Sequence, residues 1–232
     1  TSINYSSNLT WSRPSTLPEK ASPLEFVQAL KDFGNTSNWA GQNVDTWLDL
    51  LKDYQTDPAK YADGIAEVNN TKYPLKEYDL YNEVFQTGFE HLHNLSIRGG
   101  SEKIAYRLSG MYSNEDGIMI TKKDSYSRYN FNAYVNAELF KNFNASVNVF
   151  YKKDNRLTPA NMGEMFYRAL TFGSYLNPGE TTDSDGKSIP YGTPNNYLKY
   201  EDASRRYEEN LRLFGKLEYN PLPGWNITAE YT

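Results

Sequence analysis

Apolar and polar residues alternate with a period of two along seven stretches of the chain. In the first stretch, Ile3, Tyr5, Leu9 and Trp11 occupy odd positions, and every even position is Ser, Asn or Thr. This period is typical of a β-strand with one apolar and one polar face. The pattern predicts two-faced strands in residues 1–11, 94–98, 104–113, 129–139, 144–152, 210–219 and 225–232.

The connections between these strands alternate between long and short. Residues 12–90, 114–128 and 156–208 form the long connections, and residues 99–103, 140–143 and 220–224 form the short ones. An antiparallel up-and-down sheet would therefore carry its short turns on one rim and its long loops on the other. That layout is typical of a transmembrane β-barrel, with short periplasmic turns and long extracellular loops. A β-sandwich has less reason to sort its loops by length.

Aromatic residues lie near the predicted strand ends, on the apolar face. If the long loops are extracellular, one group lies at the upper ends and another at the lower ends, as expected for the two aromatic girdles of a membrane barrel. The upper group is Trp11, Tyr112, Tyr129 and Tyr151, and the lower group is Tyr219 and Trp225, with Phe140 and Phe143 beside a lower turn. The opposite face is rich in Asn and Ser, which suits a wet lumen.

Short helices are expected inside the two longest loops. Residues 22–25 read Ser-Pro-Leu-Glu, which combines a capping box with Pro at the first helical position, and Gly34 is a suitable stop. Apolar spacing in residues 47–51 predicts a second helix, and residues 164–170 predict a third.

Composition excludes several classes of protein. The 232 residues include 38% hydrophobic and 15% aromatic residues, which is too apolar for a disordered tail. A net charge of −5 argues against a protein that must neutralise nucleic-acid phosphates. The absence of Cys excludes disulfides, thiolate metal sites and a cysteine nucleophile.

The two ends of the sequence fall inside strand-like stretches. Residue 1 is Thr, and no basic and apolar signal segment follows it. We therefore expect the chain to be a piece of a longer one.

One segment resembles a known family. The residues that carry the resemblance are Phe85-Gln86-Thr87-Gly88, the run from His93 to Lys103, Tyr106, Tyr112, Glu115-Asp116-Gly117-Ile118 and Arg128-Tyr129-Asn130. They are similar to the early barrel segment of SusC/RagA-type TonB-linked (TonB-dependent) outer-membrane transporters. The match is firmest over residues 85–151, and it departs at Asp79-Leu80, where the family tends to have Asp-Trp.

The resemblance implies that residues 1–232 are part of one β-barrel domain of the 22-stranded class, closed by a plug that lies outside this sequence. It also implies import of a nutrient, such as an oligosaccharide or a peptide, across the outer membrane of a Gram-negative bacterium. The implied partners are a SusD-like surface lipoprotein, TonB through the plug segment, and outer-membrane lipid. No cofactor and no nucleic acid are implied.

Other chemistry in the sequence is weak. His91 and His93 share one strand face without an evident third ligand, so we expect interface residues at a strand end rather than a metal site. Residues 181–186 resemble a calcium loop, but Thr181 and Gly192 stand where ligands are required. No pair of carboxylates stands out as a glycosidase acid and nucleophile, so we expect no enzyme and no catalytic residue.

Four residues are the candidates for contact with a ligand or the plug. Phe150 and Arg212 are expected on the lumen face of strands, and Tyr175 and Tyr191 lie in a long loop, where aromatic rings stack on ligands. The loop aromatics, Trp39 and Trp47 included, are also expected to pack the loops' own helices or the SusD-like lid. Two alternatives to a transporter stay open at this point, a soluble or secreted glycan-binding β-sandwich and a secreted glycosidase fragment.

Overall fold

The computed structural model describes residues 1–34 and 38–232. These residues form two compact units. The first unit contains residues 1–13, 87–160 and 202–232, and the second contains residues 14–86 and 161–201.

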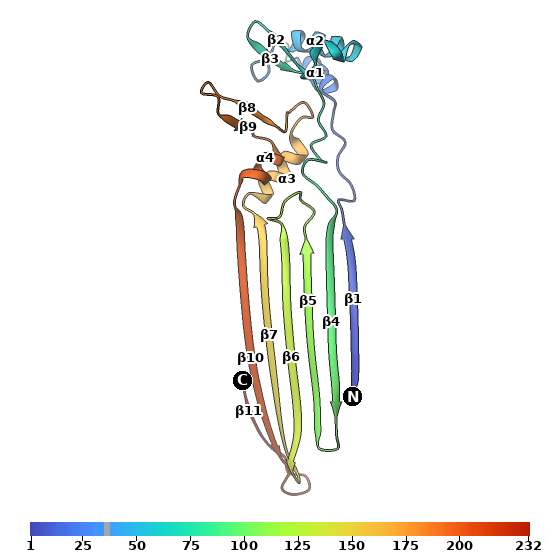
Figure 1. Ribbon diagram of the computed structural model, residues 1–232, viewed down its shortest axis with the longest axis vertical. Coiled ribbons are helices and arrows are strands. Elements are labelled where there is room, and N and C mark those ends of the chain that lie inside the picture. Colours follow the sequence, from blue (N-terminus) through green and yellow to red (C-terminus); the bar gives the residue numbers. More distant parts are fainter. Residues whose placement is uncertain (35–37) are drawn as a thin grey trace. The chain divides into compact units, whose positions relative to one another are not determined.

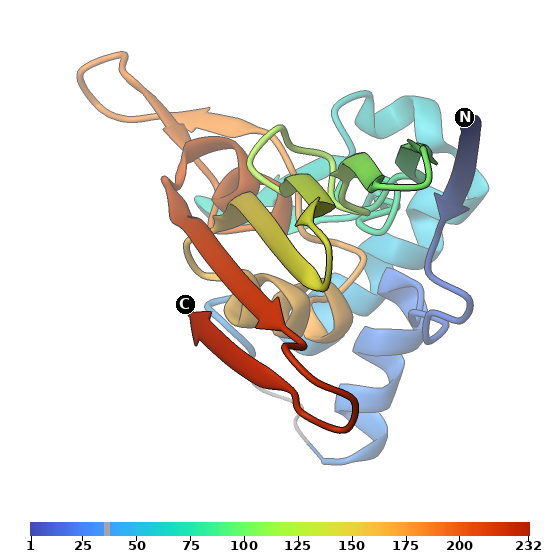
Figure 2. The ribbon, with the colours of Figure 1, turned by 90° about the horizontal axis from the view of Figure 1, so that it is seen from below.

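The first unit is a seven-stranded antiparallel sheet (Figure 1). Its strands are β1 (Ser2–Ser12), β4 (Gly88–Gly100), β5 (Ile104–Asp116), β6 (Ser125–Phe140), β7 (Phe143–Pro159), β10 (Ala203–Tyr219) and β11 (Ile227–Tyr231). Each strand pairs with its neighbours in chain order, so β1 and β11 are the two edges, and they lie apart when the sheet is viewed along its strands (Figure 2). The predicted up-and-down topology is confirmed.

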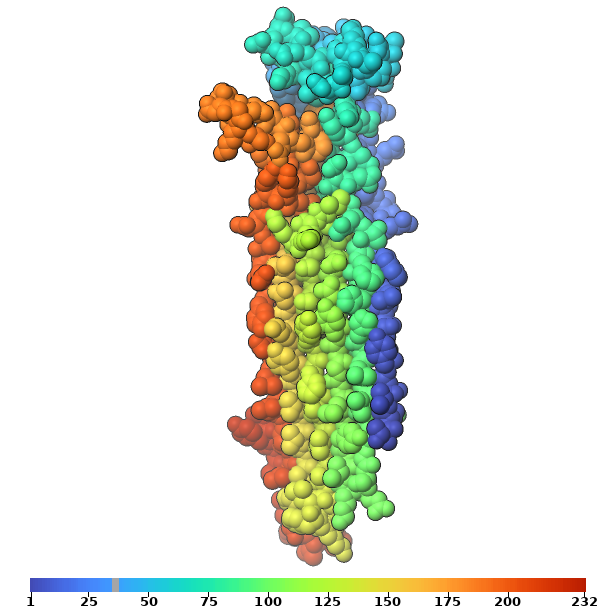
Figure 3. All heavy atoms as spheres, in the orientation of Figure 1, coloured from blue at the N-terminus to red at the C-terminus, as the bar shows by residue number. Residues whose placement is uncertain are grey.

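In β6, the apolar face of the sheet is more exposed than the polar face. Tyr129, Phe131 and Val135 are 47%, 45% and 41% exposed, whereas Asn132 and Asn136 on the opposite face are partly buried. A water-soluble sheet buries its apolar face, so this distribution is the reverse of the usual one. It is the distribution expected of strands whose apolar side chains contact lipid. One face of the sheet forms a continuous layer of side chains in Figure 3.

Aromatic rings gather on the apolar face near the two ends of the strands. At one end, Trp11 packs on Phe89 with ring centroids 5.3 Å apart, and Tyr112 stacks on Tyr129 at 4.7 Å. His91 lies between these pairs, 5.4 Å from Tyr112, and the Tyr5 hydroxyl is 2.8 Å from His93 Nδ1. At the other end, Phe140 stacks on Phe143 at 4.5 Å, and Tyr219 lies 6.0 Å from Phe143. We call the first group, Trp11, Phe89, Tyr112 and Tyr129, the upper aromatic row.

Five strands are longer than the alternation predicts: β4, β5, β6, β7 and β10. Strand β6 has 16 residues, and β7 and β10 have 17 each, so they continue past the upper aromatic row. The predicted connection 114–128 is wrong at both ends, because β5 and β6 leave only residues 117–124 between them. The predicted loop 156–208 likewise shortens to residues 160–202. Polar residues occupy most positions on both faces of these extensions, so the ladders continue where the apolar alternation has stopped.

The second unit contains the helices. They are α1 (Pro23–Asp32), α2 (Val44–Thr56), the 3-10 helix η1 (Pro58–Tyr61), α3 (Met162–Thr171) and α4 (Pro194–Tyr200), with two hairpins formed by β2 (Ile65–Val68) and β3 (Thr71–Pro74) and by β8 (Glu180–Thr182) and β9 (Ser188–Pro190). The three predicted helices are confirmed as α1, α2 and α3. Within the described residues, no helix is both long and apolar enough to cross a membrane.

Local chemistry explains the start of α1. The Ser22 hydroxyl accepts a hydrogen bond from the Glu25 backbone N–H, and the Glu25 carboxylate accepts one from the Ser22 backbone N–H, which completes the predicted capping box. Gly34 follows with φ of 84°, a conformation that glycine adopts without strain. The apolar face of α1 then packs on α2 and the β2–β3 hairpin, in a small core of Val27, Val44, Trp47, Leu48, Leu51, Ala66, Tyr73 and Leu75.

Candidate functional site

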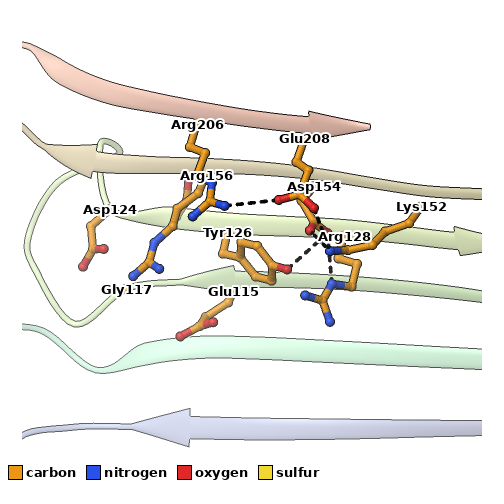
Figure 4. Close-up of a pocket in the computed structure, with 11 residues that line it drawn as sticks. Glu115, Gly117, Asp124, Tyr126, Arg128, Lys152, Asp154, Arg156, Arg206 and Glu208 are labelled. Carbon is orange, nitrogen blue, oxygen red and sulfur yellow. Dashed lines mark hydrogen bonds and ion pairs between the residues drawn. The ribbon is translucent and has the colours of Figure 1, made fainter. Parts of the chain in front are cut away.

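A charged pocket lies on the polar face of the first unit, where β6, β7 and β10 extend past the upper aromatic row. Its volume is about 460 Å³, and it contains four basic and four acidic side chains together with Tyr126. The residues that line it are Glu115, Gly117, Asp124, Ser125, Tyr126, Arg128, Lys152, Asp154, Arg156, Arg206 and Glu208 (Figure 4). We call it the rim pocket.

Strand register brings these side chains to one face. Arg128 of β6 pairs with Asp154 of β7, which pairs in turn with Glu208 of β10. Two residues nearer the upper ends of the strands, a second cross-strand row is formed by Tyr126, Arg156 and Arg206. Residues two apart on a strand share a face, so the two rows lie on the same side of the sheet.

Asp154 is the centre of the rim pocket. Its side chain accepts hydrogen bonds from Arg128 Nε at 3.0 Å and from the Tyr126 hydroxyl at 3.2 Å, and Lys152 Nζ lies 2.6 Å from its second oxygen. The residue is only 8% exposed. A carboxylate removed from water needs such partners, so this network holds β6 and β7 in register at the rim.

The other charged groups of the pocket are paired less completely. Glu208 lies 3.3 Å from Arg206 Nη2 and 3.5 Å from Lys152 Nζ. Arg156 makes no ion pair in the part of the chain that the structure describes, and no dashed line reaches it in Figure 4. The Arg128 guanidinium group donates to Asp154 through Nε, and its two terminal nitrogens point away from that carboxylate (Figure 4). The pocket therefore offers guanidinium donors that its own carboxylates do not occupy.

The rim pocket is suited to binding a polar ligand. Guanidinium, carboxylate and phenol groups recognise a polar ligand through directional hydrogen bonds. Among the described residues, no group of three or more His, Asp or Glu side chains is placed to hold a metal ion.

Two of the predicted contact residues lie on the polar face but outside the rim pocket. Phe150 of β7 pairs with Arg212 of β10 on one side and with Asn132 of β6 on the other. Both are farther from the upper ends of their strands than Asp154 and Glu208 are. The structure thus brings Phe150 and Arg212 together, and their contact with a ligand or plug stays a prediction.

The other two predicted residues lie in the second unit. Tyr175 packs on Phe26 and Trp47, with ring centroids 5.0 and 5.2 Å apart, and burial raises the pKa of its hydroxyl. Tyr191 borders a smaller pocket of about 230 Å³ beside Pro190, Tyr197 and Tyr200. Tyr175 therefore has a packing role, and contact of both residues with a ligand stays a prediction.

Sequence reasoning missed the residues of the rim pocket because it assigned most of them to long loops. A signal was present: the parity of the strand faces continues through Asn130, Arg128 and Tyr126, and through Lys152, Asp154 and Arg156. On the other face of these strands, the side chains stop being apolar at the same point. This change marks where the strands leave an apolar environment, and not where they end.

Comparisons with known proteins agree with this architecture. The chain is 30% identical over 132 residues to the TonB-dependent receptor P3 of Formosa agariphila, a match that covers 56% of this chain and 12% of the relative. It is similar in fold to the RagAB peptide transporter, with a TM-score of 0.64 and 18% identity over 98% of this chain and 27% of that chain. The RagAB peptide importer in its open-open state gives a TM-score of 0.63 and 18% identity. No protein-family profile matches the chain.

These findings confirm the resemblance predicted from the sequence. The chain resembles SusC/RagA-type TonB-dependent transporters, and its sheet is an antiparallel up-and-down segment of a transmembrane β-barrel. The chain spans about an eighth of the curated relative and about a quarter of the solved chains that it matches.

Proposed function

We propose that the chain is part of a TonB-dependent importer of the outer membrane, which takes up a nutrient such as an oligosaccharide or a peptide together with a SusD-like lipoprotein. The observation that carries this proposal is the exposed apolar face of the seven-stranded sheet, with aromatic rows near both strand ends and a polar face behind it. The similarity to a TonB-dependent receptor and to the RagAB structures supports the same reading.

The polar face supplies the part of the transport path that this chain contributes. The rim pocket lies beyond the upper aromatic row, at the strand ends that lead into the long connections. In an outer-membrane barrel those connections face the outside of the cell. A ligand delivered by a surface lipoprotein would meet the rim pocket first and the Phe150–Arg212 pair deeper in the barrel.

The sandwich alternative does not fit the observed sheet. All seven long strands belong to one sheet in chain order, whereas a sandwich divides its strands between two packed sheets. The exposed apolar face of β6 would also be a large aggregation surface on a soluble protein.

Import can be tested in cells that carry the full-length gene. Growth on a panel of oligosaccharides and peptides is compared between wild type, a strain lacking the gene, and a strain lacking TonB. The proposal predicts at least one nutrient on which both deletions abolish growth and complementation restores it. Loss of the gene without a growth or uptake defect on any of these nutrients would refute import, and a defect that is independent of TonB would refute the energy source.

Fractionation tests the location and the partner. The full-length protein is expected in the outer-membrane fraction, and an affinity tag on it is expected to copurify a surface lipoprotein in detergent. Recovery in the soluble fraction would contradict the membrane assignment.

A further inference from the structure

Two arginines face each other across neighbouring strands in the rim pocket. Arg156 of β7 and Arg206 of β10 are direct cross-strand partners and line the same pocket. Like charges directly opposite each other destabilise a sheet unless something neutralises them. The sheet carries this cost at a position where both arginines are exposed.

The carboxylates of the pocket leave this pair incompletely neutralised. Asp154 is engaged by Arg128 and Lys152, and Glu208 is shared between Lys152 and Arg206. Arg156 has no ion-pair partner among the described residues, although Asp124 and Glu115 line the same pocket. Asp124 accepts a hydrogen bond from the Met119 backbone N–H at 3.4 Å, which turns one of its oxygens toward its own loop.

We propose that Arg156 and Arg206 bind a carboxylate group of the imported nutrient, with Arg128 as a third donor. A guanidinium group offers two parallel N–H donors to a carboxylate, and two such groups on neighbouring strands surround it from two sides. The proposal rests on the function proposed above and adds that the nutrient is acidic.

The acidic members of the pocket fit the rest of such a ligand. Glu115 and Asp124 come from the end of β5 and the loop that follows it, whereas Arg156 and Arg206 come from β7 and β10. Carboxylates accept hydrogen bonds from hydroxyl or amide N–H groups. An oligomer with carboxylates along a chain of hydroxyl or amide groups matches both sets of residues.

The test measures binding to the full-length transporter in detergent, together with the lipoprotein that copurifies with it. Four fluorescent probes are compared by anisotropy: tetragalacturonate and its methyl ester, and tetraglutamate and tetraglutamine, both peptides carrying a C-terminal amide. The two acidic probes distinguish an acidic oligosaccharide from an acidic peptide as the source of the carboxylate. Each acidic probe differs from its neutral partner only in its carboxylate groups.

The double variant carries R156Q and R206Q together, and R205Q is the matched control. Arg205 is adjacent to Arg206 on β10 but lies on the opposite face, where it pairs with Leu157. We expect wild type to bind at least one acidic probe more tightly than its neutral partner, and the double variant to bind that acidic probe about tenfold more weakly. The control should keep the wild-type preference.

Three outcomes would overturn the carboxylate site. They are equal binding of acidic and neutral probes, absence of binding by both acidic probes, and a preference that survives in the double variant. The import proposal fails separately, through growth and TonB dependence, because the probe measurements need no transport. Circular dichroism, and migration on gels with and without heating, are the checks that the double variant folds as wild type does.

Discussion

Arg128 of β6 and Asp154 of β7 are cross-strand partners, and Arg128 Nε donates a hydrogen bond to Asp154 Oδ1 over 3.0 Å. The pair lies beyond the upper aromatic row, where neither face of the sheet is apolar. At the rim, side-chain hydrogen bonds therefore take the place of apolar cross-strand contacts beside the backbone ladder.

Removing the charge of Asp154 should loosen the rim. Asp154→Asn weakens its hydrogen bonds with Arg128, Lys152 and Tyr126, and hydrogen bonds to charged groups contribute about 1.5–3 kcal/mol each to stability. We expect a lower free energy of unfolding for the full-length barrel, measured by urea titration in lipid vesicles. Asp202→Asn is the control, because Asp202 is exposed and precedes β10. If Asp154→Asn and wild type have equal free energies of unfolding, the network does not stabilise the barrel.

The two faces of β6 should respond oppositely to the same charge. Val135 lies on the apolar face and Asn136 on the polar face of the strand. Arginine at a lipid-facing position near the bilayer midplane costs about 2–4 kcal/mol, so Val135→Arg should lower the free energy of unfolding by that amount. Asn136→Arg should change it little. A similar loss for both variants in vesicles would show that the faces are assigned wrongly.

The features that the sequence predicts well are local ones. Alternation in residues 129–139 and the capping box at Ser22 and Glu25 each depend on residues close together in the chain. The strand faces, their order and the three helices follow from such patterns, because period and capping chemistry act within one element.

The rim pocket depends on pairs that are distant in the sequence. Arg128 meets Asp154, and Arg156 meets Arg206, only because β6, β7 and β10 stay paired beyond their apolar stretches. The alternation of apolar and polar residues carries little information there, since both faces are mostly polar. The pairing continues because the hydrogen-bond ladder of the backbone is set by the register established lower in the sheet.

The β8–β9 hairpin should loosen in acid. Glu180 accepts hydrogen bonds from Ser188, Tyr200 and Lys199, and these bonds lower its carboxyl pKa to about 2 from an ordinary value of 4.5. A depressed pKa stabilises the hairpin above pH 4.5, and the effect is lost as the pH falls from 4.5 through 2. Hydrogen exchange of residues 180–190, corrected for the intrinsic rate, should show falling protection over this range. Glu180→Gln should show low protection that does not depend on pH.

The core of the second unit should depend on Trp47. This side chain is 1% exposed, and its Nε1–H donates to the Pro74 carbonyl over 2.7 Å. Trp47→Ala should destabilise the unit by about 3–5 kcal/mol, which limited proteolysis of residues 14–86 would detect as faster cleavage. Trp39 is 40% exposed, so Trp39→Ala is the matched control. Unchanged cleavage of the Trp47 variant would contradict the packing role.

The Phe150–Arg212 pair tests whether the polar face below the rim pocket takes part in import. The two residues are opposite each other on β7 and β10, and neither lines the rim pocket. If a nutrient passes along this face, Phe150→Ala removes an aromatic contact and Arg212→Ala removes a donor, so both variants should take up the nutrient more slowly at matched expression.

The control for this pair is Val149→Ala, next to Phe150 on the apolar face of the same strand. It should leave uptake unchanged, because its side chain lies on the face opposite the proposed transport path. Surface binding of the nutrient is measured beside uptake, since a contact deep in the barrel should slow passage more than it weakens capture. If both variants bind and import like wild type, and deletion of residues 161–201 also leaves uptake unchanged, this segment serves only as barrel wall and the nutrient is recognised elsewhere.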